Sequence, residues 1–118
     1  MYLLIINGFE EGRLIELSNE INQIGRSEHG EKNGHENTIV LAHDNKISKV
    51  HARIIRKNDG LFLEDMKSTH GTFHNNSKVV YPAHISTGDV IHLGATLFMV
   101  CDDKDNVPQM KMALSKVL

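Results

Sequence analysis

The fold of this chain is decided by residues 50–65, VHARIIRKNDGLFLED. In Val50–Lys57 every second residue is apolar as far as Ile54, which is the period of a strand with one buried face. Asn58-Asp59-Gly60 predicts a hairpin turn, because Asp-Gly tolerates positive φ. Leu61–Asp65 resumes the alternation. The stretch therefore predicts two antiparallel strands joined by a tight turn.

Similar short runs continue on both sides of this hairpin. They are rich in aliphatic and β-branched residues and are separated by turn signals at close intervals. We expect further strands at Tyr2–Ile6, Arg13–Leu17, Asn22–Gly25, Ile39–Leu41, Thr72–His74, Val79–Tyr81, Val90–Leu93 and Thr96–Cys101. Strands do not alternate with helices, so nothing supports a nucleotide-binding parallel sheet. The pattern predicts an all-β sandwich or barrel.

The bulk composition bounds the class of protein. A length of 118 residues is typical of one domain that buries its own core. The net charge of −2 argues against nucleic acid and an acidic membrane surface as partners. Cys101 is the only cysteine, so no intrachain disulfide can form, and a reducing compartment is expected. The apolar run Leu3–Ile6 is too short for a signal peptide or a membrane span. We therefore expect a cytoplasmic protein.

The composition changes near the end of the chain. We expect a sandwich domain over residues 1–102 and a tail over 103–118. Four apolar tail residues, Met110, Leu114, Val117 and Leu118, recur at helical spacing. This spacing predicts a short helix packed on the sandwich, or alternatively a linker or contact helix that leads to another domain of a longer parent chain.

Three short motifs lie between the predicted strands. They are Gly25-Arg26, Ser48-Lys49-Val50-His51 and Ser68-Thr69-His70-Gly71-Thr72. A phosphothreonine carries about −1.5 to −2 charges and three acceptor oxygens. An arginine can bind two of these oxygens with its planar fork, and a serine hydroxyl can donate to a third. The motifs therefore predict a site that grips a phosphate group on another protein.

The order Gly-Arg, Ser-x-x-His, Ser-x-x-Gly-Thr resembles the forkhead-associated (FHA) domain family. The resemblance covers roughly Tyr2 to Cys101, since Gly88-Asp89-Val90-Ile91-His92-Leu93-Gly94 matches the family's final hairpin, and Asp65 and Asn75 also fit. It implies an FHA-like β-sandwich of about eleven short strands that binds phosphothreonine peptides through loops at one end. It implies a module for signalling or regulated assembly that is not an enzyme. We expect no cofactor and no small-molecule substrate.

The resemblance also assigns the binding residues. Arg26 and Ser48 would contact the phosphate, Lys49 would be a second cation or else a solvated loop lysine, and Thr69 and His70 would contact the peptide. The family usually has asparagine at His70, whose amide both donates and accepts, whereas a neutral imidazole does so with a different geometry. This departure leaves an alternative open, a phosphate-independent interaction or scaffold module with a degenerate pocket.

Four further residues are expected to support these loops: Gly25, His51, Gly71 and Asn75. By the resemblance, His51 hydrogen-bonds to backbone and holds the loop that presents Ser48. A Ser48–His51 nucleophile and base pair is not expected, because nothing supplies an orienting acid or an oxyanion hole. A metal site is not expected either, although the chain has eight histidines. His70 and His74 would lie about 13 Å apart along a strand, too far to share one ion.

Overall fold

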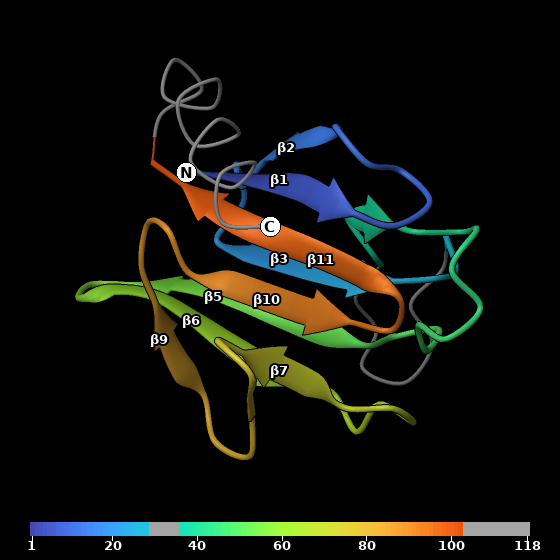
Figure 1. The fold of residues 1–118 in the computed structure, drawn as a ribbon. Helices are drawn as coiled ribbons and strands as arrows, with labels where there is room; N and C mark the ends of the chain where they lie inside the picture. Colours follow the sequence, from blue (N-terminus) through green and yellow to red (C-terminus); the bar gives the residue numbers. More distant parts are fainter. Residues whose placement is uncertain (29–35, 103–118) are drawn as a thin grey trace.

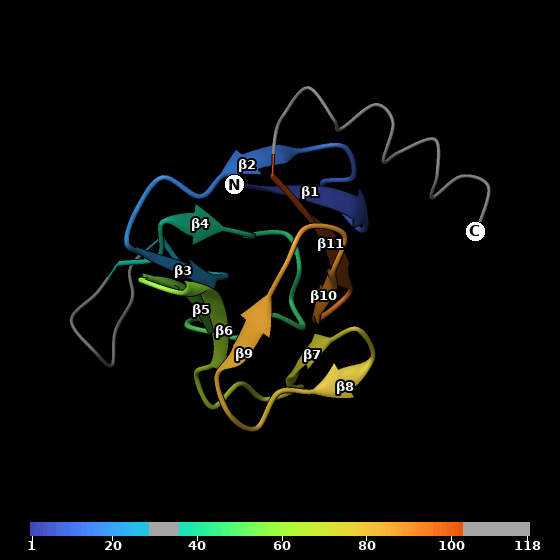
Figure 2. The same ribbon diagram turned by 90° about the vertical axis from the view of Figure 1, so that its left-hand side faces the viewer.

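The computed structural model describes residues 1–28 and 36–102, which form two β-sheets packed face to face (Figures 1 and 2). Eleven strands lie within these ranges: β1 Tyr2–Asn7, β2 Leu14–Glu16, β3 Ile21–Gly25, β4 Ile39–Val40, β5 Ala52–Lys57, β6 Gly60–Asp65, β7 Thr72–His74, β8 Ser77–Lys78, β9 Ala83–Ile85, β10 Val90–Leu93 and β11 Thr96–Cys101. The predicted all-β sandwich is confirmed. Over the same ranges, no helix is long and apolar enough to cross a membrane.

The strands divide between a six-stranded sheet, in the order β2-β1-β11-β10-β7-β8, and a five-stranded sheet, in the order β4-β3-β5-β6-β9. The hairpin β5–β6 forms as predicted, with Ala52 opposite Asp65 and Lys57 opposite Gly60. Gly60 has a φ of +135°, which a side chain would resist. The hairpin therefore supplies the centre of the second sheet.

The expected strand Val79–Tyr81 is wrong. β8 belongs to the six-stranded sheet and β9 to the five-stranded sheet, and this segment crosses from one sheet to the other. Val79 is buried in the core, whereas Val80 and Tyr81 are 73% and 79% exposed. Pro82 follows and has no N–H for a strand ladder. The apolar run here marks a crossover, which strand periodicity does not distinguish from a strand.

The core lies between the sheets and consists of inward-facing strand residues together with buried residues of the connecting segments. The largest fully buried members are Leu3, Ile5, Leu17, Ile24, Ile39, Leu41, Ile47, Ile54, Leu63, Ile91 and Phe98. Each such side chain contributes about 1.5–3 kcal/mol when removed from water. This burial fixes which face of each strand points inward.

The loops that bear the three motifs gather at one end of the sandwich (Figure 1). β3 ends there, β5 begins there, and the connection from β6 to β7 turns there. β11 ends at the opposite end, where Cys101 pairs with Tyr2 at the start of β1. The predicted tail, 103–118, lies outside the described residues.

Candidate functional site

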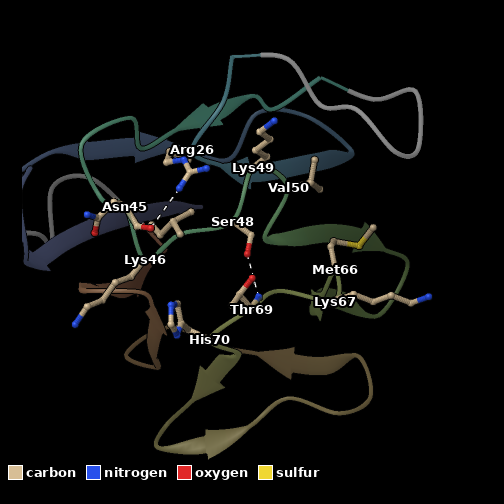
Figure 3. A pocket seen from close by; sticks show the side chains of 11 residues that line it. Arg26, Asn45, Lys46, Ser48, Lys49, Val50, Met66, Lys67, Thr69 and His70 are labelled. Carbon is tan, nitrogen blue, oxygen red and sulfur yellow. Dashed lines mark hydrogen bonds between the residues drawn. The ribbon is translucent and has the colours of Figure 1, made fainter.

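Arg26 directly follows β3 and lies over the loop that carries Ser48 (Figure 3). Its backbone N–H donates to the carbonyl oxygen of Ser48 at 3.0 Å. Its guanidinium Nη1 donates to the carbonyl oxygen of Asn45 at 3.3 Å. The side chain has five N–H donors, so these contacts orient it and leave further donors for a ligand.

Ser48 connects the second and third motifs. Its Oγ accepts a hydrogen bond from the backbone N–H of Thr69 at 3.0 Å (Figure 3). That bond uses a lone pair of the hydroxyl and not its proton, so the O–H can still donate to a phosphate oxygen. The two loops are thus held side by side by the same group that the sequence predicts for phosphate contact.

His51 is completely buried beneath these loops. Its Nδ1 accepts from the backbone N–H of Ser48 at 3.0 Å, so its Nε2 carries the proton and donates to the carbonyl oxygen of Gly71 at 2.9 Å. Burial lowers the pKa of His51 and outweighs the raising effect of the bond to Gly71. The neutral ring therefore bridges two backbone segments and is bonded to the amide of Ser48, not to its hydroxyl.

The third motif is organised around the carboxylate of Asp65. Oδ1 accepts from the hydroxyls of Ser68 and Thr72, both at 2.6 Å, and Oδ2 accepts from the backbone N–H of Ser68 at 3.2 Å. Ser68 Oγ in turn accepts from the N–H of Gly71, whose φ is +89°. Partial burial acts to raise the pKa of Asp65, but these hydrogen bonds outweigh it and the pKa is lowered. The ionised carboxylate therefore shapes the turn that presents Thr69.

Gly25 is required by a close approach of backbone. A Cβ at this position would overlap the carbonyl oxygen of Lys49 and the side-chain amide of Asn37. The end of β3 can therefore lie against the loop of Ser48 only because residue 25 has no side chain.

Asn37 is a supporting residue that the sequence analysis missed. It is 7% exposed, and its Nδ2 donates to the carbonyl oxygens of Ser27 and Lys49, both at 2.6 Å. Its Oδ1 accepts from Nε2 of Gln23 at 3.1 Å. It lies in a polar stretch of sequence, and nothing in that composition distinguishes it from Glu36 and Thr38, which are exposed.

Asp44 is a second supporting residue that the sequence analysis missed, and it is 2% exposed. Its Oδ2 accepts from the N–H of Ala95 at 2.9 Å and the hydroxyl of Thr96 at 2.7 Å. Its Oδ1 accepts from the N–H of Lys46 at 3.1 Å. The carboxylate thus ties the segment that leads to Ser48 onto the β10–β11 turn.

These loops enclose an open cavity of about 420 Å³. Its lining consists of Arg26, Asn45, Lys46, Ile47, Ser48, Lys49, Val50, Met66, Lys67, Thr69 and His70 (Figure 3). Four of these residues are arginine or lysine, and no acidic side chain occurs among the lining residues that the structure describes. All five residues predicted to contact a phosphopeptide therefore share one cavity. Lys67 was not predicted, because a lone loop lysine carries no sequence signal.

Asn75 lies apart from this cavity, in the turn between β7 and β8 with a φ of +48°. Its Oδ1 accepts from the N–H of Val90 at 2.8 Å, and its own N–H donates to the carbonyl oxygen of Val90 at 2.8 Å. It therefore ties the β7–β8 turn to β10.

Within residues 1–28 and 36–102, no group of three His, Cys, Asp or Glu side chains could hold a metal ion.

Comparisons with known proteins agree with this geometry. The FHA domain family model matches residues 22–94, and the chain belongs to this family. It is 30% identical over 95 residues to the FHA domain-containing protein FhaB of Mycobacterium tuberculosis, covering 80% of this chain and 56% of FhaB. The chain thus spans about half the length of that relative.

Solved structures show the same fold. The FHA domain of the CT664 protein from Chlamydia trachomatis superposes with a TM-score of 0.74 at 28% identity, covering 86% of this chain and 96% of that one. Mycobacterium tuberculosis EmbR, solved in complex with a low affinity phosphopeptide, gives a TM-score of 0.70 at 26% identity, covering 83% of this chain and 23% of EmbR. FHA domains are non-catalytic binding modules, and the family typically binds phosphothreonine peptides.

Proposed function

We propose that this domain binds a phosphothreonine-containing segment of another protein in the cavity at the loop end of the sandwich. The observation that carries the proposal is the cavity itself, where Arg26 and Ser48 lie together among further cations with no acidic side chain in the described lining. Such a site favours an anion of about two charges over a neutral peptide. The binding would serve signalling or regulated assembly.

Each group has a distinct part in this proposal. The guanidinium of Arg26 binds two phosphate oxygens with its planar fork, and the O–H of Ser48 donates to the third. Lys46, Lys49 and Lys67 line the same cavity and add to its positive potential. The lining also includes the apolar residues Ile47, Val50 and Met66. Burying the methyl group of a phosphothreonine against them would contribute about 0.8 kcal/mol to the binding free energy. We therefore expect phosphothreonine to bind at least about fourfold more tightly than phosphoserine.

The test is calorimetry with a phosphothreonine peptide library and its unphosphorylated counterpart. Arg26→Ala removes charge-assisted hydrogen bonds worth about 1.5–3 kcal/mol, so affinity should fall about 10- to 150-fold. The matched control is Arg13→Ala, because Arg13 also donates to a backbone carbonyl, that of Val40 at 3.1 Å, but lies outside the cavity lining. Unchanged affinity in Arg26→Ala would show that the phosphate does not bind here.

A second candidate function follows from His70, which lines the cavity where the family usually has asparagine. An imidazole makes fewer hydrogen bonds to a peptide backbone than an amide does. The domain would then bind a protein partner independently of phosphate. Equal affinities for phosphorylated and unphosphorylated partner would favour this function and contradict the first.

A further inference from the structure

The outer face of the six-stranded sheet carries a row of apolar side chains. The side chain of Leu3 belongs to the core, so that of Leu4 points outward. Leu4 is opposite Leu14 of β2 and Met99 of β11, and Met99 is opposite Val90 of β10. A solvated face of an antiparallel sheet normally carries polar residues. This row crosses four strands and contains no polar residue.

The centre of the face is buried. An outer-face cluster is formed by Leu4, Met99 and Cys101, which are 1%, 8% and 0% exposed and are separate from the main core. The described apolar side chains that pack against it are Tyr2, Ile6 and Val90. These belong to the same strands and stand beside the cluster, because side chains of a strand project roughly perpendicular to the sheet. They flank the cluster but do not cover it.

The segment best placed to cover this face is 103–118. It follows β11, whose last residue, Cys101, belongs to the outer-face cluster. Met110, Leu114 and Val117 recur at the spacing of one helical face. From residue 110 to residue 118 a helix would extend about 12 Å, and adjacent strands lie about 4.8 Å apart. The apolar part of the segment is thus long enough to reach across about three strands.

We propose that residues 103–118 dock across the outer face of the six-stranded sheet, with Met110, Leu114 and Val117 against the outer-face cluster. β11 ends opposite the loops that enclose the cavity (Figure 1). Docking of the segment therefore leaves the cavity open to a peptide. The proposal is independent of the function proposed for that cavity.

Cys101 reports directly on this cover because it is the chain's single cysteine. Its burial raises the pKa of the thiol, so a covered Cys101 reacts slowly with a disulfide reagent such as Ellman's reagent. In the full chain, Leu114→Asp should accelerate labelling at least about tenfold, since a charge in an apolar interface prevents docking. Ser115→Asp adds the same charge outside the apolar spacing and should leave the rate unchanged.

Met110→Asp provides a second variant, with the same expected acceleration. Far-UV circular dichroism checks that the sandwich stays folded in all three variants, which is expected because the changes lie outside residues 1–102. Equal labelling rates in Leu114→Asp and Ser115→Asp would overturn the proposal. So would labelling that accelerates on dilution and ignores Leu114, because a second copy of the chain would then cover the face.

Discussion

The support of the loops by Asn37 can be tested with the single change Asn37→Asp. The replacement has nearly the same size, but it puts a carboxylate oxygen where Nδ2 now donates to the carbonyls of Ser27 and Lys49. Two partly buried hydrogen bonds are lost at about 1–3 kcal/mol each, roughly 4 kcal/mol together. The bond from Gln23 Nε2 remains and becomes charge-assisted, which returns about 1 kcal/mol. The free energy of unfolding should fall by about 3 kcal/mol.

Urea unfolding followed by circular dichroism measures this loss. For a domain of this size it corresponds to a drop in melting temperature of about 12 °C. The matched control is Asn58→Asp, which adds the same charge at an exposed position in the β5–β6 turn. Should Asn37→Asp unfold within about 0.5 kcal/mol of this control, Asn37 does not hold the loops and the reasoning is refuted.

Three further changes test other parts of the framework. Gly25→Ala forces a Cβ into the carbonyl of Lys49 and should cost more than about 3 kcal/mol in urea unfolding; a native-like midpoint would contradict the close approach. Burial lowers the pKa of His51 below 6.5, so stability is complete above that pH and falls below it. His51→Gln should flatten this slope in urea titrations from pH 7 to 5. Thr72→Val removes the 2.6 Å hydrogen bond to Asp65, so the free energy of unfolding should fall by about 1–2 kcal/mol and the pKa of the Asp65 carboxyl should rise in an NMR titration. An unchanged pKa of Asp65 would contradict this role of Thr72.

Local patterns predicted the parts of the fold that depend on local physics. The β5–β6 hairpin follows from a period of two residues and an Asp-Gly turn, and both act within a few residues of each other. The predicted contact residues also share one cavity, because each follows or precedes a strand at the same end of the sandwich. The motifs are therefore informative once the strands between them are known.

The remaining features depend on contacts between distant parts of the chain. Asp44 bonds the hydroxyl of Thr96, 52 residues away, and no property of either neighbourhood predicts this pairing. The run Val79–Tyr81 is apolar throughout, but its residues have different surroundings. Val79 enters the core, whereas Val80 and Tyr81 are exposed in a crossover. A short window of sequence shows which residues are hydrophobic but not which distant residues they contact. Such positions are therefore assigned correctly only in the folded chain.

The exposed and buried residues of the site have different physical tasks. The groups that would touch a ligand lie on loops, and ordering a loop costs about 1–2 kcal/mol per residue in conformational entropy. His51, Asn37, Asp44 and Asp65 bond the backbone or hydroxyls of these loops, so the loops are already ordered in the free domain. A ligand that meets an ordered site loses less affinity to this cost. The affinity of the cavity for a ligand therefore depends on these four supporting residues as well as on Arg26.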